Sequence, residues 1–328
     1  MKIIHYVLSD RYAGIEQHVN ELAVEQSKSN KVLIITNSKI EKYFNKNLKI
    51  IKSPNYGRRN FSSIFFLLKT IKDERPNIIH THGTKTTKLI NRIKFFLKLN
   101  HIATVHGIKS NIKDYLKADA IIGVSKAIQN LFHSEINIIE NWYNPIFNNH
   151  NSKDIYKSYY LAIGRLEKIK NFDVLIKCWS SQQDKLLIIG TGLEKTKLEA
   201  LIKDLHMEEQ ISIIDEVDIE SLKTYYQNAK ALIISSKKEG GPRVALEALA
   251  SGIPVISTPV GHMADILPKE LISDSSSFED IKTMLDRNIK TIDQFKYDSI
   301  YEYVRNEYSI KNKCREINLV YESLLNDS

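Results

Sequence analysis

The sequence predicts an α/β protein made of two doubly wound parallel sheets. Short apolar runs rich in β-branched residues alternate with helical patterns along the chain, which is typical of consecutive βαβ units. An asparagine-rich stretch without periodicity, residues 141–158, interrupts this alternation once and predicts a linker. The length of 328 residues is enough for about two domains. We therefore expect two Rossmann-like domains that face each other across a cleft.

The expected first domain, residues 1–150, alternates short buried strands with amphipathic helices. The links between these elements are short, as they are in a doubly wound sheet. The strand candidates are residues 2–8, 31–36, 77–80, 101–105, 120–124 and 136–140, and the helix candidates are residues 15–27, 61–72, 86–99 and 126–132.

The expected second domain, residues 151–305, repeats the alternation. Its strand candidates are residues 159–164, 185–190, 211–214, 231–235 and 254–257, and its helix candidates are residues 172–180, 194–205, 219–228 and 242–250. Residues 301–325 are helical, and we expect a C-terminal helix of about residues 306–328 to pack back on the first domain. Ligands of open α/β sheets bind beyond the carboxyl ends of the strands, so a site is expected in the loops after the strands.

The composition excludes several classes of protein. Hydrophobic residues make up 42% and charged residues 26%, which is too apolar for a disordered chain. No apolar run approaches the length of about 18 residues that a spanning helix needs, and the N-terminus lacks the pattern of a signal peptide. Cys178 and Cys314 are too far apart for a disulfide framework or a zinc motif, which fits a reducing cytoplasm. The net charge of +8 suggests an anionic partner.

A glycine loop between a strand and a helix is the most informative feature of the second domain. The loop contains Gly240 and Gly241, and Pro242 stands at the expected first position of the helix. Arg243 and Val244 follow in the first helical turn. The start of this helix points backbone N–H groups at the expected cleft, which suits a phosphate.

Two glutamates flank the start of this helix. Glu239 precedes it, and Glu247 lies about a turn and a half into it. Two acidic acceptors beside an anion site suit a ligand with hydroxyl groups on both sides of a diphosphate, such as a nucleotide sugar. A surface loop with two incidental carboxylates is the alternative, but strand, glycine loop, proline and both glutamates coincide here.

In this setting the sequence resembles the retaining glycosyltransferases of family 4. These enzymes have the GT-B fold and carry a glutamate, seven residues and a second glutamate between a strand and a helix. The resemblance implies that Glu239 contacts the donor sugar and Glu247 the ribose. Gly241 stands where the family has an apolar residue, whereas Pro242 is kept. The implied donor-binding residues of this turn are Gly240, Gly241, Pro242, Arg243, Val244 and Glu247.

A second motif follows the first strand of the second domain. Gly164 and Arg165 come directly after that strand, and Lys170 follows before the next helix. Arg165 offers a bidentate fork and Lys170 a point charge, which together suit a diphosphate leaving group. Alone, such residues are usually solvated surface charges. The family has Gly-Arg-Leu and then Lys-Gly or Lys-Asn here, so the resemblance implies donor contact by Gly164 and catalytic roles for Arg165 and Lys170.

The first domain resembles the family at two further places. Gly14 opens the first helix where the family has two glycines near the donor phosphates, and Ala13 replaces the other one. His106 ends a strand where the family has a histidine that faces the donor sugar, which implies a catalytic role. We expect Ser125 to cap the helix that follows it.

Gly190 and Gly192 allow a rival interpretation. They follow a strand and open a helix, and Asp215 comes about where a dinucleotide fold places its ribose-binding acid. Lys195 takes the place of the third glycine, so an NAD-dependent dehydrogenase is the weaker alternative. The family has a similar turn beside the nucleotide base, which assigns Gly190 to the donor site.

No metal or other cofactor is expected. The sequence has no Asp-X-Asp motif and no cluster of cysteine and histidine. Arg165, Lys170 and the helix start would instead stabilise the departing nucleoside diphosphate. The loop of residues 259–265 resembles a family loop that borders the nucleotide, with His262 replacing a glycine and Asp265 a glutamate. By resemblance, the new bond keeps the anomeric configuration.

The basic and aromatic stretch from Thr84 to Asn100 has two open interpretations. A basic amphipathic helix can rest on an anionic membrane leaflet that presents a lipid-linked glycan, or it can pack into the core with a solvated basic face. Further basic residues of the same domain are Arg58, Arg59, Lys109, Lys113 and Lys117. No recognised nucleic-acid-binding motif is present, so nucleic acid is not an expected partner.

These features predict a metal-independent retaining glycosyltransferase with a UDP- or GDP-linked sugar donor and a glycan or lipid-linked acceptor. Family analogy places it in bacterial surface polysaccharide, lipopolysaccharide or O-antigen biosynthesis. We expect it in the cytoplasm, with peripheral contact to the inner face of the cytoplasmic membrane still open. A sugar-nucleotide epimerase of the same fold and a non-catalytic nucleotide-sugar-binding subunit remain alternatives: the first needs no acceptor, and the second binds without turnover.

Overall fold

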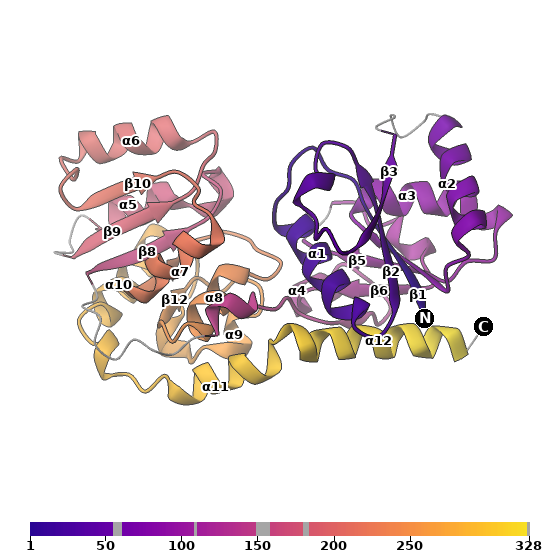
Figure 1. The fold of residues 1–328 in the computed structure, drawn as a ribbon. Helices are drawn as coiled ribbons and strands as arrows, with labels where there is room; N and C mark the ends of the chain where they lie inside the picture. The colour runs from indigo at the N-terminus through magenta and orange to yellow at the C-terminus, as the bar shows by residue number, and fades with distance from the viewer. Residues whose placement is uncertain (55–60, 108–109, 149–157, 180–183, 327–328) are drawn as a thin grey trace. The chain divides into compact units, whose positions relative to one another are not determined.

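The structure is a computed structural model that describes residues 1–54, 61–107, 110–148, 158–179 and 184–326. The chain divides into two compact units, both drawn in Figure 1. Unit 1 comprises Met1–Asn141 and Ile310–Ser328, and unit 2 comprises Trp142–Ser309. Three basic residues named above, Arg58, Arg59 and Lys109, lie outside the described residues.

The boundary between the units lies after residue 141, not near residue 150 as the sequence predicts. Tyr143 and Phe147 are buried in the core of unit 2, and the hydroxyl of Tyr143 donates to the backbone carbonyl of Arg305 at 3.0 Å. These buried aromatic side chains hold the first part of the expected linker in unit 2, where Pro145–Phe147 forms the 3-10 helix η4. Residues 149–157 of that linker lie outside the described residues.

The described part of unit 1 contains a seven-stranded sheet with the order β3-β2-β1-β4-β5-β6-β7, and all its strand pairs are parallel. The strands are β1 (Lys2–Val7), β2 (Lys31–Asn37), β3 (Lys49–Ser53), β4 (Ile78–His82), β5 (His101–Val105), β6 (Ala120–Gly123) and β7 (Asn137–Ile138). The helices are α1 (Gly14–Ser27), η1 (Glu41–Tyr43), α2 (Phe61–Glu74), α3 (Thr84–Ile93), η2 (Lys94–Phe96), η3 (Tyr115–Lys117), α4 (Lys126–Gln129) and α12 (Ile310–Asn326). The strand order changes direction between β1 and β4, which makes this the topological switch point.

Strand β3 is not among the strands that the sequence predicts. It is a short strand at the edge of the sheet, and only Ser53 of its residues is fully buried. Lysines interrupt its apolar residues, so the run of β-branched side chains that marks the inner strands is missing. The predicted helix of residues 86–99 is also shorter, because α3 ends at Ile93 and the 3-10 helix η2 follows.

The described part of unit 2 contains a five-stranded parallel sheet with the order β10-β9-β8-β11-β12. The strands are β8 (Tyr159–Ile163), β9 (Lys185–Ile189), β10 (Ile211–Ile214), β11 (Ala229–Ile234) and β12 (Val255–Ser257). Besides η4, the helices are η5 (Lys168–Lys170), α5 (Phe172–Trp179), α6 (Lys195–Asp204), α7 (Ile219–Gln227), α8 (Arg243–Ala250), α9 (Met263–Ile266), η6 (Lys269–Leu271), α10 (Phe278–Asn288), η7 (Ile292–Gln294) and α11 (Asp298–Glu307). The switch point of this sheet lies between β8 and β11.

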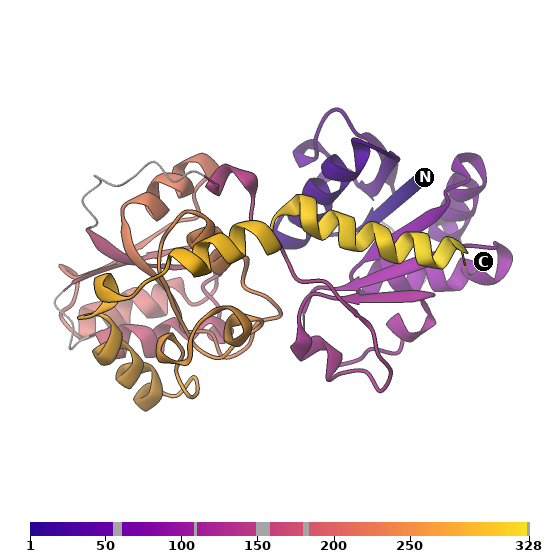
Figure 2. The same cartoon turned by 90° about the horizontal axis from the view of Figure 1, so that it is seen from below.

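The C-terminal segment forms two helices where the sequence predicts one. Helix α11 belongs to unit 2 and packs against α8, whereas α12 belongs to unit 1 and packs against α1 (Figure 2). Tyr308 leaves the helical conformation with φ −102° and ψ 21°, which ends α11 without a glycine or proline. The α12 helix therefore begins at Ile310 rather than near residue 306.

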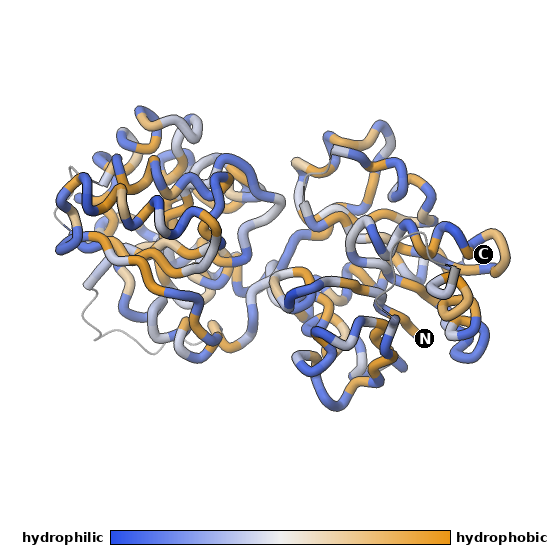
Figure 3. Tube along the Cα trace, turned by 90° about the horizontal axis from the view of Figure 1, so that it is seen from above, coloured by the Kyte–Doolittle hydropathy of each residue, from blue (hydrophilic) through white to orange (hydrophobic). Residues whose placement is uncertain are grey.

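The inner strands are buried almost throughout, as β1 and β2 show, and hydrophobic and hydrophilic segments alternate along the chain in both units (Figure 3). This is the pattern of two sheets that are each buried on both faces. Among the described residues, no helix combines the length and the apolar character needed to cross a membrane.

Candidate active site

The loops after β8 and β11 meet at the switch point of unit 2 and carry an ion pair. The Nζ atom of Lys170 donates to Oε1 of Glu239 at 2.8 Å, and the two side chains are only 18% and 14% exposed. The hydroxyl of Ser236 donates to the same glutamate oxygen at 2.5 Å, and that of Ser235 donates to the backbone carbonyl of Lys170 at 2.8 Å. The structure thus brings together two of the predicted catalytic residues.

Arg165 lies apart from this pair. Its side chain is 74% exposed, and its Nη1 atom lies 2.7 Å from Oε1 of Glu167. Gly164, by contrast, packs closely against Lys170: a Cβ atom on Gly164 would lie 3.0 Å from Cε of this lysine. The fork of Arg165 and the point charge of Lys170, which the sequence assigns to one diphosphate, therefore engage separate carboxylates in this structure, although both residues lie in one loop.

The glycine turn after β9 packs directly on the loop after β8. A Cβ atom on Gly190 would lie 1.9 Å from the carbonyl oxygen of Gly164, and one on Gly192 would lie 2.4 Å from that of Leu166. These close backbone contacts account for glycine at both positions, so no bound dinucleotide is needed to explain them. Asp215, the acid that an NAD site would use for the ribose, pairs with Lys195 at 2.6 Å.

Helix α8 begins at Arg243, one residue later than predicted. Pro242 has φ −71° and ψ 103°, so it is the residue before the helix and not its first member. Gly261, in the loop after β12, has φ 58°, and a Cβ atom there would lie 2.7 Å from Cδ of Pro242. This loop supports the turn of Gly240 and Gly241 and places the N-terminus of α8 beside the Glu239 loop.

Glu247 is buried on α8 and is held by a residue that the sequence does not identify. The hydroxyl of Tyr226, on α7, lies 3.2 Å from Oε2 of Glu247 and 3.2 Å from the backbone carbonyl of Val244. Burial, and then the charge of Glu247, raises the pKa of Tyr226 well above its usual range, so the hydroxyl stays a donor. No sequence signal distinguishes Tyr226 from the neighbouring Tyr225. His262 of the predicted nucleotide loop is buried, and its ring centroid lies 5.4 Å from that of Tyr308.

Two predicted residues of unit 1 lie after its strands, at the starts of helices. Gly14 begins α1, and a Cβ atom there would meet no described atom within 4 Å. The turn before it is held by Glu16, whose Oε2 accepts from the backbone N–H of Ala13 at 2.9 Å and whose pKa is raised by burial. Ser125 stands at the N-cap position of α4, but its hydroxyl makes no capping hydrogen bond within the described residues.

His106, which follows β5, is joined to buried histidines. Its Nε2 atom lies 3.1 Å from Nδ1 of His82, and its ring meets that of His18 edge to face at 4.7 Å between centroids. The ring of His82 also lies beside that of His5, on the neighbouring strand β1, and that of His80, two residues earlier on β4. The sequence signal for this group is His80-Thr81-His82, since residues two apart on a strand share one face.

Helix α3 packs its apolar side into unit 1. Leu89, Ile90 and Ile93 belong to the core beside the sheet, which is the core-packing interpretation of this helix. The 3-10 helix η2 that follows α3 is not packed into the core in this way, because Phe95 is 92% exposed and Phe96 is 66% exposed.

Two Rossmann-like units, each with a parallel sheet and loops of this kind after its strands, define the GT-B fold. Comparison with protein families gives the particular group. The model described as Glycosyltransferase Family 4 matches residues 12–146, and the model described as Glycosyl transferases group 1 matches residues 146–288. The chain belongs to this family of glycosyltransferases.

Individual relatives agree. An uncharacterized glycosyltransferase of Methanocaldococcus jannaschii is 26% identical over 278 residues, which is 77% of each chain. The N-acetylgalactosamine-N,N'-diacetylbacillosaminyl-diphospho-undecaprenol 4-alpha-N-acetylgalactosaminyltransferase of Campylobacter jejuni is 30% identical over 241 residues, 65% of each chain. The match covers less than two thirds of several other curated relatives, for example 44% of the O-antigen chain mannosyltransferase RfbU of Salmonella typhimurium, which is 26% identical over 45% of this chain.

Solved structures show the same fold. Anabaena HepE in complex with UDP-glucose superposes with a TM-score of 0.84 at 14% identity, over 98% of this chain and 100% of that one. Sucrose-phosphate synthase from Thermosynechococcus elongatus has a TM-score of 0.85 at 16% identity and covers 100% of both chains.

Proposed function

We propose that the protein transfers a sugar, with retention of anomeric configuration, from a UDP- or GDP-linked donor to a glycan or lipid-linked acceptor. The observation that carries this proposal is the Lys170–Glu239 pair at the switch point of unit 2. A sheltered ammonium and carboxylate in one place match the two halves of a sugar diphosphate, since phosphate needs a cation and sugar hydroxyl groups need an acceptor.

Donor binding would exchange partners within this pair. The diphosphate takes the Lys170 ammonium, and the released Glu239 carboxylate accepts from sugar hydroxyl groups. Negative charge on the diphosphate grows as the bond to the sugar breaks, so Lys170 stabilises the transition state more than the bound donor. Glu247, oriented by Tyr226, is the acceptor for the ribose hydroxyl groups. Gly14, Gly190 and the start of α8 offer backbone close to the nucleotide.

We propose that no metal or other cofactor takes part. Lys170 and the N-terminus of α8 supply positive charge at the leaving group, and Arg165 would join them once its side chain turns from Glu167 to the diphosphate. In metal-dependent sugar transferases the metal has this role. The test is a transfer assay with and without excess EDTA. Equal rates support the proposal, and a loss that magnesium or manganese restores would refute it.

Retention is tested on the product. The acceptor hydroxyl attacks from the face that the diphosphate leaves, with His106 near the sugar and no side chain assigned as a protein nucleophile. Proton NMR of the first product formed from an α-linked donor should show an α linkage. A β linkage would refute this proposal while leaving glycosyl transfer intact.

The relatives suggest the biological setting. The name of the Campylobacter jejuni relative describes a diphospho-undecaprenol acceptor, and that of the Salmonella typhimurium relative an O-antigen chain. We therefore propose a cytoplasmic role in bacterial surface polysaccharide or lipopolysaccharide biosynthesis. Radiolabelled UDP- and GDP-sugars are offered to the protein with lipid-linked glycan extracts. Conversion of the donor to its epimer without an acceptor, or binding without turnover, would favour an epimerase or a binding subunit instead.

The acceptor would then lie in a membrane, and unit 1 offers a surface for it. Exposed apolar side chains occupy elements that contact α3: Phe65 on α2, Phe95 and Phe96 on η2, and Leu116 on η3. Lysines lie among them, and Lys94 forms an ion pair with Asp119. We propose that this surface rests on an anionic bilayer, where aromatic side chains enter the interface and lysines face the headgroups.

Vesicle sedimentation tests this contact. Wild-type protein should sediment with vesicles that contain phosphatidylglycerol and much less with pure phosphatidylcholine. The double variant Phe95→Ser/Phe96→Ser should lose most of the binding, whereas Leu319→Ser, which removes a side chain that is 57% exposed on α12, should keep it. Equal sedimentation of both variants would refute the assignment of this surface.

A further inference from the structure

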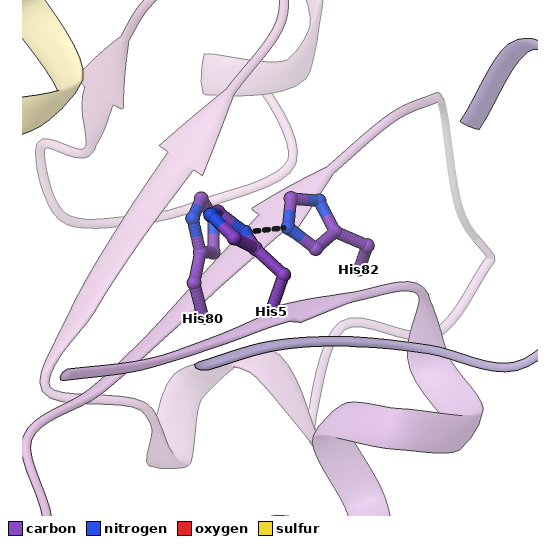
Figure 4. A group of neighbouring side chains, drawn as sticks. All are labelled: His5, His80 and His82. Carbon is purple, nitrogen blue, oxygen red and sulfur yellow. Dashed lines mark hydrogen bonds between the residues drawn. The ribbon is translucent and has the colours of Figure 1, made fainter. Parts of the chain in front are cut away.

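Strands β1 and β4 place buried histidines behind His106. Their register pairs His5 with His80 and Val7 with His82. His5, His80 and His82 therefore share one face of the sheet, because side chains alternate along a strand. All three are buried, and Figure 4 shows them together. The proposed donor contacts give these three rings no role.

A chain of hydrogen bonds runs from His106 through two of these rings to the C-terminal helix. Nε2 of His106 lies 3.1 Å from Nδ1 of His82, and Nε2 of His82 lies 3.0 Å from Nδ1 of His5 (Figure 4 draws the second contact). Nε2 of His5 lies 2.7 Å from Oε1 of Gln26, on α1. The amide nitrogen of Gln26 donates to Oδ1 of Asn318, on α12, at 2.9 Å.

The carbonyl oxygen of Gln26 sets the direction of each of these bonds. It can only accept, so Nε2 of His5 carries the proton, and the lone pair of this neutral ring is on Nδ1. That lone pair accepts from the Nε2–H group of His82. By the same step, Nδ1 of His82 accepts from the Nε2–H group of His106. His106 is thereby held with its proton on Nε2 and its lone pair on Nδ1.

Burial keeps the inner rings neutral, as this direction requires. It lowers the pKa of His5 from the ordinary 6.5 to about 4, and it lowers the pKa of His82 well below the usual range, with further lowering by the neighbouring histidines. A charged ring would present two donors and would break the chain at that point.

We propose that this chain of side chains, named here the histidine relay, positions His106 for sugar recognition. The relay consists of His82, His5, Gln26 and Asn318. It fixes the Nε2–H tautomer of His106 and so presents Nδ1 as an acceptor for a hydroxyl group of the transferred sugar. An acceptor of fixed position selects donors that carry a hydroxyl there over their deoxy analogues. The catalytic part rests on the proposed function, whereas the tautomer is a property of unit 1 alone.

Histidines so close together also raise the question of a metal ion. One nitrogen each of His5, His80 and His82 lie within 4.8 Å of one another. The rings of His80 and His82, however, lie 4.2 Å apart between centroids at an interplanar angle of 35°, so their faces overlap more than their in-plane lone pairs converge. The nitrogens of His80 are also engaged, 2.6 Å from the hydroxyl of Tyr321 and 2.6 Å from that of Thr104. For His5, His80 and His82 this geometry favours the relay over a metal site.

The direct test is NMR of full-length protein labelled with 15N-histidine. Histidines are assigned by single substitution, and metal content is measured on the same sample. We expect His5, His82 and His106 each to carry the proton on Nε2, with N–H···N scalar couplings from His106 to His82 and from His82 to His5. Protons on Nδ1, missing couplings, or nitrogen shifts of metal-bound rings together with a stoichiometric metal would overturn the proposal.

A kinetic cycle tests the link to catalysis. Gln26→Leu leaves the donor group of His5 without its acceptor, and we expect kcat/KM to fall about tenfold. In a His106→Ala background the same change should cause no further loss, because Gln26 acts only through His106. Gln17→Leu, the same substitution on the same helix, is the matched control and should keep the rate.

An equal loss in both backgrounds would mean that Gln26 acts by general stability, and it would overturn the relay. Should Gln26→Leu fail to fold, Asn318→Ala removes the end of the relay at a half-buried position and enters the same cycle. The NMR measurement needs no substrate. A protein with the expected tautomers and no transferase activity would therefore refute the proposed function and not the fixed tautomer.

Discussion

The Nζ atom of Lys170 lies 2.8 Å from Oε1 of Glu239, so the cation and the carboxylate assigned to opposite halves of the donor hold each other in this structure. An ion pair that is mostly shielded from water must be opened before the donor can bind. Opening is favourable only if the ligand supplies both a phosphate for the lysine and hydroxyl groups for the glutamate. The pair thereby favours complete nucleotide sugars over ligands that replace only one partner.

Loss of the lysine should act on turnover. We expect Lys170→Ala to lower kcat by about 100-fold, the usual cost of removing one group that stabilises transition-state charge, with a smaller rise in donor KM. Lys168→Ala removes an exposed lysine of the same loop and should change neither value. Steady-state kinetics over a range of donor concentration separates the two parameters. A change confined to KM would show that Lys170 only binds the donor.

The buried glutamate should act on nucleotide affinity. Glu247→Ala removes the proposed ribose acceptor, and calorimetric titration with the matching nucleoside diphosphate should give a Kd raised at least tenfold. Tyr226→Phe should weaken binding only a few-fold, since this tyrosine orients Glu247 and does not touch the ligand. Tyr225→Phe is the control next to it. Unchanged affinity in Glu247→Ala would remove this residue from the site.

Two glycine substitutions should separate folding from function. Gly190→Ala forces a Cβ atom to within 1.9 Å of a backbone oxygen, and we expect a loss of about 3 kcal/mol or more in the stability of unit 2. Trp142 and Trp179 both lie in unit 2, so tryptophan fluorescence during urea unfolding reports it.

Gly14→Ala should behave in the opposite way. A Cβ atom there meets nothing within 4 Å, and alanine favours the helical backbone, so stability should hold or rise by about 0.5–1 kcal/mol. Transferase activity should still fall, because the methyl group keeps the donor away from the backbone. Hydrogen exchange in α1 measures the first effect and the transfer assay the second. Full activity would place Gly14 outside the donor site.

Unit 1 should lose stability in mild acid. Burial lowers the pKa of His5 to about 4 and that of His101 to about 3, from an ordinary value of 6.5. Between pH 6.5 and about 4 the unfolded chain therefore binds more protons than the folded one, and each such histidine removes about 1.4 kcal/mol per pH unit as the pH falls. This stabilising contribution is fully present above pH 6.5.

Hydrogen exchange of peptides from β1, β4 and β5 at pH 7 and pH 5 measures this loss. His101→Gln should reduce the pH dependence by about one proton. A stability of unit 1 that stays level between the two pH values would show that the buried histidines are not held neutral.

Local patterns were sufficient to predict the strands of both sheets except the edge strand β3, and the loops that carry Lys170 and Glu239. Each inner strand and each glycine turn leaves a signal within a few neighbouring residues, whereas lysines interrupt the apolar run of β3. The break between α11 and α12 leaves no such signal, because neither Tyr308 nor Ser309 is a helix-breaking residue. The two helices are distinct because α11 packs on unit 2 and α12 on unit 1. The helical pattern of residues 301–325 is continuous, so the sequence predicts one helix there.

Partners across the sheet could not be predicted in the same way. Tyr226 reaches Glu247 from another helix, and the histidine relay depends on the register that pairs His5 with His80. Such contacts arise from tertiary packing, and one sequence does not specify which strand residues become neighbours. The sequence could not predict that the Arg165 side chain is exposed and paired with Glu167 either, because the spacing of residues along the chain does not determine side-chain conformation.

The donor site itself is tested most directly by a thermal-shift screen of the purified protein against UDP, GDP, their common sugar conjugates and NAD, repeated with Lys170→Ala. We predict that one nucleoside diphosphate and its sugar conjugate raise the Tm of the wild type, with a smaller shift in the variant. A shift with NAD alone, or equal shifts of wild type and variant with every nucleotide, would contradict a nucleotide-sugar site at the Lys170–Glu239 pair.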